Sequence, residues 1–240
     1  MSMTEQFITH VSDAYRRQPA PLETLPAVLV SACVEVLPVV GAGISLTLDE
    51  LRVPLGASDE QVAAAERLQT TLGEGPCLSA MRAGEPVSFD EAAMAERWPV
   101  FHGQVLSATP FRSIVSVPIR SAGACVGALD LYRADSDLMP MSELSELSSG
   151  IGAQISYLLF DAPTKAFDFG ITMPVWLSNA TVTDRMNVWV AIGMLMEHAE
   201  LTNTTALAVL RAYAFGHDQS LDETAGRLVD GSLKPVSLVG

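Results

Sequence analysis

Several side chains between residues 211 and 227 have the chemistry needed to read unpaired RNA bases. Aromatic rings and guanidinium planes can stack on bases, while histidine, glutamine and arginine can form hydrogen bonds with base edges. The residues that we expect in this role are Arg211, Tyr213, His217, Gln219 and Arg227. Phe215 lies among them, and we expect it to pack in the interior.

These residues also have structural alternatives. Tyr213 can be a half-buried core residue with its hydroxyl at the rim, and Arg211 can pair with Asp222 or Glu223. His217 lies in a polar turn between two predicted helices, where it can cap a helix end. The sequence leaves both interpretations open.

The charge balance opposes strong, general binding to nucleic acid. Residues 181 to 240 hold four basic and seven acidic side chains, a formal charge of −3. The whole chain has a net charge of −14 at pH 7. Affinity for nucleic acid depends largely on neutralising phosphates with lysine and arginine, so a general coat of nucleic acid or anionic membrane is disfavoured.

No residue pattern of a common enzyme is present. Gly41-Ala42-Gly43 lacks the further glycine and the lysine of a phosphate-binding loop. The four histidines are isolated, with no Cys, His or Asp at metal-ligand spacing, so we expect no metal site. Asp222 and Glu223 suit the first turn of a helix, where the helix dipole favours carboxylates. We therefore expect no catalytic residues and no enzyme, and the sequence identifies no cofactor.

The segment that leads into this region is a helix with almost no polar side. From Met186 to Met196 only Asn187 is polar. Such a helix must be covered on all sides, and it is shorter than the roughly 20 apolar residues that span a bilayer. Two short helices cannot cover it, so we expect a homodimer. The expected contact residues are Val188, Trp189, Ile192, Leu195 and Met196.

Two further helices follow, each with its own start signal. Thr202, Asn203 and Thr204 offer N-caps for a helix that ends near Gly216. The segment that begins Ser220-Leu221-Asp222-Glu223 fits a capping box, and Gly231 lies where a left-handed C-cap is expected. The C-terminal region is therefore predicted to contain one long and two short helices.

The combined pattern of these helices resembles an ANTAR domain. The matching residues are Ala191, Gly193-Met194-Leu195-Met196, Ala206, Leu210-Arg211-Ala212-Tyr213-Ala214, His217, Leu221, Ala225 and Leu228-Val229. The resemblance implies a three-helix RNA-binding module that acts in transcription antitermination. It also implies a dimer joined through the first helix that binds paired RNA hairpins.

The N-terminal part of the chain predicts an α+β domain. Helices are expected at Thr4–Arg17, Asp59–Leu72 and Leu144–Leu159. Strands are expected at Gly43–Leu48, Leu51–Leu55, Val87–Phe89, Ser113–Ile119 and Ala124–Tyr132. The turn Arg120-Ser121-Ala122-Gly123 joins the last two strands as a hairpin. Antiparallel strands with helices around them indicate the α+β class.

This part of the chain resembles a GAF domain. The matching residues are Leu72-Gly73-Glu74-Gly75-Pro76-Cys77, Pro86-Val87, Asp90, Arg97-Trp98-Pro99, Phe101, Ser113-Ile114, Ser116-Val117-Pro118-Ile119 and Gly127-Ala128-Leu129-Asp130-Leu131-Tyr132. The resemblance implies a small-molecule sensing module with a central antiparallel sheet. It does not identify the ligand.

A ligand pocket between sheet and helices would be lined by five residues of this segment. They are Cys77, Trp98, Phe101, Ser116 and Asp130. Each has an alternative: Trp98 and Phe101 can be a core pair, and Cys77 can be buried packing rather than an attachment point. A redox role for Cys77 is a further hypothesis.

These patterns predict a chain of four segments. We expect an N-terminal helix in residues 1–21, a GAF domain in 22–160, an apolar linker in 161–180 and an ANTAR domain in 181–235. The linker is apolar enough that we expect it to pack against protein or to form a short helix near Pro174–Asn179. Three scattered cysteines and the lack of a signal peptide indicate a cytoplasmic protein.

Two main hypotheses for function follow. The first is an RNA-binding antitermination regulator in which the GAF domain senses an unknown signal and the ANTAR domain binds hairpin RNA as a dimer. The second is a dimeric regulator that acts through protein partners, with RNA binding weak or lost.

Overall fold

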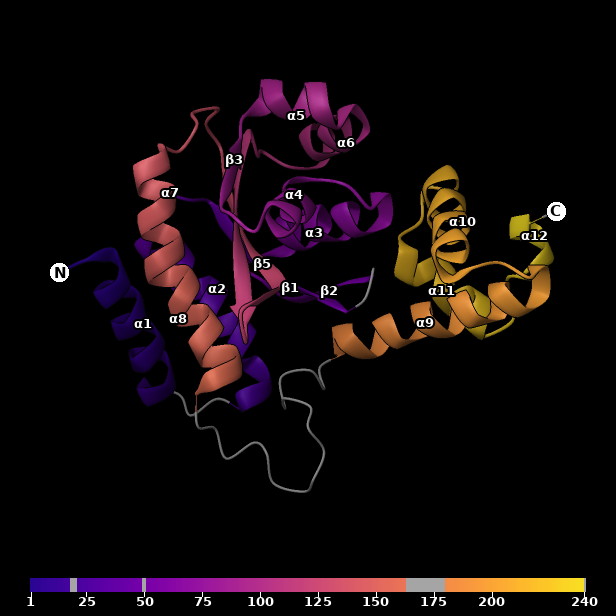
Figure 1. The fold of residues 1–240 in the computed structure, drawn as a ribbon, viewed down its shortest axis with the longest axis horizontal. Helices are drawn as coiled ribbons and strands as arrows, with labels where there is room; N and C mark the ends of the chain where they lie inside the picture. The colour runs from indigo at the N-terminus through magenta and orange to yellow at the C-terminus, as the bar shows by residue number, and fades with distance from the viewer. Residues whose placement is uncertain (18–20, 49–50, 163–179, 240) are drawn as a thin grey trace.

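The computed structural model describes residues 1–17, 21–48, 51–162 and 180–239. An α+β domain and a three-helix unit lie side by side along the longest axis, with the N-terminus at one end and the C-terminus at the other (Figure 1). The predicted linker lies almost wholly outside the described residues.

The α+β domain is built on one antiparallel sheet of five strands. The strands are β1 (Gly41–Leu48), β2 (Leu51–Ala57), β3 (Val87–Phe89), β4 (Ser113–Ser121) and β5 (Ala124–Arg133). Their order across the sheet is β2-β1-β5-β4-β3. The predicted hairpin joins β4 and β5 through Ala122 and Gly123, which both have positive φ (48° and 84°), as a two-residue turn of this kind requires.

Helices cover both faces of this sheet. One face carries α1 (Met3–Arg17), α2 (Leu25–Val36) and a helix from Met141 to Asp161 that comprises α7 (Met141–Leu147), η2 (Ser148–Gly152), α8 (Ala153–Ser156) and η3 (Tyr157–Asp161). The other face carries α3 (Glu60–Leu72), α4 (Pro76–Ala83), α5 (Glu91–Arg97) and α6 (Pro99–Ala108). A short helical turn, η1 (Leu22–Thr24), precedes α2.

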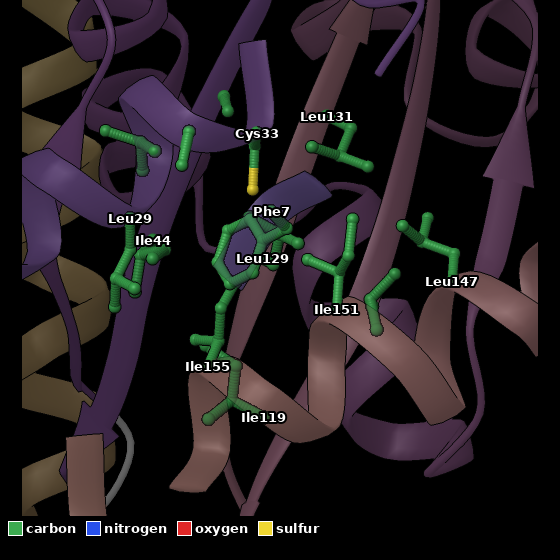
Figure 2. Close-up of a cluster of buried hydrophobic side chains, with 14 of the residues drawn as sticks. Phe7, Leu29, Cys33, Ile44, Ile119, Leu129, Leu131, Leu147, Ile151 and Ile155 are labelled. Atoms are coloured by element: carbon green, nitrogen blue, oxygen red, sulfur yellow. The ribbon is translucent and has the colours of Figure 1, made fainter. Parts of the chain in front are cut away.

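The main hydrophobic core lies on the α1, α2 and α7 side of the sheet. Leu129 and Leu131 of β5 point into it together with Phe7 of α1 and Ile151 and Ile155 of the Met141–Asp161 helix (Figure 2). Side chains alternate along a strand, so Ala128, Asp130 and Tyr132 face α3 and α4 instead. This alternation gives the sheet one apolar face and one face with buried polar groups.

Two helices on the second face were not predicted. α5 and α6 are only 7 and 10 residues long. In α6 the buried Phe101 and Val105 are at helical spacing, but Val100 and Leu106 are apolar as well, so the periodicity is weak. Asp90, whose carboxylate accepts a hydrogen bond from the Ala93 amide at 2.7 Å, caps α5 and provides the local start signal.

The three-helix unit consists of α9 (Ala180–Ala199), α10 (Asn203–Gly216) and α11 (Leu221–Val229), followed by a short α12 (Val236–Val239). The predicted capping box of Ser220 and Glu223 is present, and Gly231 has a φ of 81°. Val188, Ala191, Ile192 and Leu195 of α9 are buried against α10 and α11. The described part of the chain thus has the three helices that the sequence predicts.

The two parts are in direct contact. α9 packs on β2, and α10 and α11 pack on α3. Leu51 of β2 is buried in the hydrophobic cluster of the three-helix unit, and Trp189 of α9 touches the cores of both parts. No helix in the described segments combines the length and the apolar character that crossing a bilayer requires.

We predict that α1 is an integral part of the α+β core. Phe7 is completely buried whereas its neighbour Ile8 is 41% exposed. Phe7→Ala should lower the free energy of unfolding by about 3–5 kcal/mol, because it removes a large buried side chain and leaves a cavity. Ile8→Ala, the matched control, should change it by about 0.5 kcal/mol or less. Urea unfolding measures both, and equal effects would place α1 outside the core.

Candidate functional site

Eight polar side chains meet between the sheet and helices α3 and α4. We call them the buried polar cluster: Ser45, Arg52, Glu66, Gln69, Cys77, Ser116, Asp130 and Tyr132. None is more than 1% exposed. Strand alternation points the five strand residues to this face, and α3 contributes Glu66 and Gln69, one turn apart.

Arg52 of β2 lies at the centre of the cluster. Its Nη2 donates to Asp130 Oδ2 at 3.0 Å and to Glu66 Oε2, its Nη1 donates to the Glu66 carbonyl at 2.9 Å, and its Nε donates to Cys77 Sγ at 3.0 Å. Burial alone would lower the pKa of Arg52, but the surrounding acidic groups outweigh this effect and raise that pKa. The guanidinium is therefore a permanently charged group with every nitrogen engaged.

Asp130 of β5 and Gln69 of α3 connect the sheet to the helices. Asp130 accepts hydrogen bonds from Ser116 Oγ at 2.6 Å and from Gln69 Nε2 at 2.8 Å, besides that from Arg52. Gln69 Oε1 in turn accepts from the Cys77 amide at 3.1 Å. One carboxylate therefore orients residues of two strands and one helix, and through Gln69 it also holds the start of α4.

Glu66 is the titratable group of the cluster that can change charge near neutral pH. The Tyr132 hydroxyl donates to Glu66 Oε1 at 2.6 Å. Burial raises the pKa of Glu66 to about 7; the positive charge of Arg52 opposes this increase and the charge of Asp130 adds to it. Its protonation therefore changes the net charge inside the domain with little change in solvent exposure.

The environment of Cys77 opposes a reactive thiol. Burial raises its pKa to about 12, although the charge of Arg52 acts in the other direction. The thiolate is the nucleophilic and easily oxidised form, so this side chain is protonated and protected at neutral pH. The redox hypothesis for Cys77 thus has no support in the geometry, and the thiol serves as a hydrogen-bond acceptor for Arg52.

The polar cluster contains three of the five predicted ligand residues. Cys77, Ser116 and Asp130 lie in it, whereas Trp98 and Phe101 belong to an adjoining hydrophobic cluster with Met94, Phe111 and Ile114, which the ring of Tyr132 also joins. The rings of Trp98 and Phe101 meet edge to face with centroids 6.5 Å apart, as a core pair. The two sets of residues therefore do not form one pocket.

Sequence reasoning missed Ser45, Arg52, Glu66, Gln69 and Tyr132. A signal for Arg52 was available, because it is the only charged residue in the otherwise apolar strand Leu51–Leu55. Glu66 and Gln69 look like ordinary surface residues of a helix. Only their spacing, on the same face as the buried Val62, could have indicated that they point inward.

The cluster is closed to solvent, because none of its side chains is more than 1% exposed. Its donors and acceptors satisfy one another, so a small molecule could enter only by displacing one of these side chains. In the described segments no group of three or more His, Cys, Asp or Glu side chains is placed to hold a metal ion. The side chains of this site can therefore hold charge and form hydrogen bonds with one another.

The sheet, its helices on both faces and its polar interior define the class of α+β domains with a central antiparallel sheet. The model of the GAF domain family matches residues 19–157, more than half of the chain. This protein therefore belongs to the GAF domain family, whose members are typically signal-sensing regulatory modules.

The chain is also similar to several solved structures. The GAF domain of a phosphoenolpyruvate-protein phosphotransferase from Acinetobacter is 16% identical, over 66% of this chain and 93% of that chain, with a TM-score of 0.47. The corresponding domain from Coxiella burnetii is 18% identical over 65% and 96%, with a TM-score of 0.45. A free methionine-R-sulfoxide reductase from Neisseria meningitidis is 14% identical over 66% and 90%, with a TM-score of 0.43. No curated protein matches the chain.

Three of the five residues predicted to read RNA lie around the turn between α10 and α11. The rings of Tyr213 and His217 are stacked, with centroids 3.9 Å apart and planes at 15°. His217 Nδ1 lies 2.8 Å from the Tyr213 carbonyl, which can only accept, so Nδ1 carries the proton. Gln219 Oε1 accepts a hydrogen bond from Thr224 at 3.1 Å.

Arg211 and Arg227 have different surroundings. Arg211 Nε donates to the carbonyl of Thr70 on α3, 3.2 Å away, so this side chain is held against the GAF domain. Arg227 is half-buried on α11. Asp222, one of the two carboxylates considered as a partner for Arg211, accepts a hydrogen bond at Oδ2 from Arg185 at 2.9 Å.

The residues predicted at a dimer contact lie mostly inside one chain. Val188, Ile192 and Leu195 are 0%, 3% and 0% exposed, and Trp189 and Met196 are half-buried. The second and third helices therefore cover more of α9 than the apolar run suggests. The part of α9 that stays uncovered carries Met186 and Val190, which are 55% and 49% exposed.

The raised pKa of Glu66 makes the stability of the protein depend on pH. Below its ordinary pKa of 4.5, Glu66 is protonated whether the chain is folded or unfolded; between 4.5 and about 7 it keeps its proton only when folded. Its contribution to the free energy of unfolding is therefore full below pH 4.5 and is lost as pH rises to about 7.

We predict that the stability difference between the wild-type protein and Glu66→Gln falls across this pH interval. Urea unfolding at a series of pH values measures it. Glu60→Gln, an exposed position at the start of the same helix, is the matched control for loss of a carboxylate. A difference that stays constant with pH would show that Glu66 does not titrate in this range.

Proposed function

We propose that this protein is a signal-sensing regulator whose three-helix unit is an ANTAR-type module that binds hairpin RNA. The observation that carries the proposal is the gathering of Tyr213, His217 and Gln219 at the turn between α10 and α11. The GAF domain supplies the sensing function that is typical of its family. The proposed role of the module is transcription antitermination.

The stacked pair suits the recognition of an unpaired base. An exposed ring can stack on a base. Because Nδ1 of His217 donates to the Tyr213 carbonyl, the Nε2 of the neutral imidazole can accept a hydrogen bond from a base edge. His217 is exposed, and Tyr213 behind it fixes its orientation. Recognition of a small loop needs few phosphate contacts, which is compatible with the charge of −3 in residues 181–240.

We predict that the protein binds an RNA with two small-loop hairpins and that His217→Ala weakens this binding about tenfold. The loss of one base–aromatic contact costs roughly 1–3 kcal/mol, and 1.4 kcal/mol corresponds to tenfold in affinity. His198→Ala, an exposed histidine on α9, is the matched control. Electrophoretic shifts at several salt concentrations measure both, with a shallow salt dependence expected because few phosphates are neutralised.

A second candidate function is a regulator that acts through protein partners. The acidic balance of the three-helix unit and the engagement of Arg211 with α3 favour it. Sequencing of RNA that co-purifies with the protein separates the two candidates. Enrichment of hairpin-bearing leaders supports the first, and a lack of enrichment together with no shift of the hairpin RNA supports the second.

The proposed module is a homodimer joined through the uncovered face of α9. Met186, Val190, Gly193 and Glu197 lie on one side of this helix and are exposed. An added Cβ at Gly193 would meet no atom within 4 Å among the described residues outside its own helix backbone, so no contact seen there requires glycine. A glycine on an exposed helix face lets a second helix approach closely, and a second copy of α9 would bury the two large apolar side chains.

We predict that Val190→Glu shifts the protein from dimer to monomer, because each dimer would have to bury two new carboxylates at the contact. Val236→Glu, which changes an exposed valine on α12, should leave the dimer intact. Sedimentation velocity at micromolar concentration measures both. A wild-type protein that sediments as a monomer would contradict the dimeric part of the proposal.

A further inference from the structure

The C-terminal end of α3 holds the three-helix unit through Arg211. The Arg211 Nε donates to the Thr70 carbonyl at 3.2 Å, and the guanidinium lies against Gly73, which ends α3 with a φ of 70°. A Cβ added at Gly73 would come within 2.7 Å of Arg211 Nη1. The last carbonyls of a helix carry partial negative charge, so a guanidinium is a favourable partner there.

A second contact lies one residue further along α3. The Thr71 hydroxyl accepts a hydrogen bond from the Leu221 amide, the first of α11, at 3.2 Å. The capping interaction with Ser220 lowers the pKa of Glu223, and the positive charge of Arg67 on α3 adds to this effect. Both helices that flank the proposed RNA-reading turn are therefore attached to α3.

Two clefts lie beside the contact between the two parts. One, of about 470 Å³, is lined by residues of β2, α3, α9 and α11. The other, of about 260 Å³, is lined by Thr71 of α3 together with Phe215 of α10 and with Asp218 and Gln219 of the turn. The contact of α3 at Thr71 is therefore polar and borders open space, whereas the contact of β2 buries Leu51. Motion between two parts of a chain is expected unless the interface between them is large and hydrophobic.

The face of α3 that carries Glu66 and Gln69 belongs to the buried polar cluster. Glu66 and Gln69 bind Arg52, Tyr132, Asp130 and the Cys77 amide, while Thr70, Thr71 and Gly73 hold the three-helix unit. The Gly73 amide also donates to the Gln69 carbonyl at 2.9 Å. A rigid helix of 13 residues with these two sets of contacts transmits a displacement at the cluster to its C-terminal end.

We propose that α3 is a latch, which holds the three-helix unit docked with Arg211 covered until a change in the buried polar cluster releases it. Only the consequence of release rests on the proposed function: once the three-helix unit is released, Arg211 and the neighbouring turn are available to RNA. The docked arrangement is the inactive state. The signal acts by rearranging the partners of Glu66 and Gln69.

The latch is tested by Gly73→Lys in the full chain. The new side chain places bulk and positive charge against Arg211, so the docked state is lost. Gly84→Lys is the matched control, because Gly84 ends α4 with nearly the same φ, 69°, and faces Arg120 of the same domain. Both variants carry the same added charge and the same backbone strain.

Two readouts report docking without RNA. The radius of gyration from small-angle X-ray scattering should increase, and hydrogen exchange of the Leu221 amide should become at least about tenfold faster, because loss of one protecting contact worth about 1.4 kcal/mol gives that factor. These changes are expected for Gly73→Lys and not for Gly84→Lys. Thr71→Val, which removes the acceptor for Leu221 with little change in shape, provides a second variant for the scattering measurement. If both interface variants stay as compact as the control, the latch is refuted.

Affinity for the two-hairpin RNA then separates the latch from the proposed function. A released variant that binds the RNA more tightly than Gly84→Lys supports both. A released variant that does not bind RNA leaves the latch supported and overturns RNA binding as the output.

The link to the cluster is tested by Gln69→Leu. This substitution removes the hydrogen bonds to Asp130 and to the Cys77 amide but touches neither Arg211 nor Leu221. Circular dichroism verifies that the variant is folded. An increased radius of gyration supports transmission through α3, and a folded variant that remains docked refutes it.

Discussion

The structure depends on one buried positive charge. Arg52 is 1% exposed, and an isolated charge in that position would be far too costly for the fold to tolerate. The carboxylates of Asp130 and Glu66, the backbone carbonyl of Glu66 and the thiol of Cys77 meet all three of its nitrogens. Satisfying this guanidinium forces α3 to pack with its polar face inward and places the start of α4 over the sheet.

This requirement explains why the two faces of the sheet differ so strongly. On the α1 and α2 side, leucine, isoleucine and valine side chains form a core that depends on shape and burial (Figure 2). On the α3 side, hydrogen-bond geometry determines the arrangement, and the charge of Glu66 acts on Arg52, Asp130 and Tyr132 together.

Helix α3 connects that interior to the rest of the molecule. Asp59 caps the start of the helix, Gly73 ends it in the left-handed conformation, and few of its side chains face only solvent. Through its length and its two sets of partners, α3 forms one path of direct contacts from the buried polar cluster to the three-helix unit. The contacts of Trp189 with both hydrophobic cores continue that path on the β2 side.

Local sequence signals predicted the elements that have strong local causes. The β4–β5 hairpin follows from alternating side chains and a two-residue turn, and α11 follows from the capping box of Ser220 and Glu223. The family assignment of residues 19–157 agrees with the resemblance read from Gly73–Cys77 and the closing strands. The helices α5 and α6 were missed because short helices on a core face need no amphipathic period.

The sequence by itself determined the α+β character of the first part, the three helices of the second and the apolar nature of α9. Only the tertiary structure decided which residues share a site. Arg52 and Asp130 are 78 positions apart, and Arg211 is 141 positions from Thr70, so no local pattern relates them. The physical reason is that periodicity shows which face of an element is apolar, whereas the partner of a buried charge or an uncovered helix face is set by how distant segments pack.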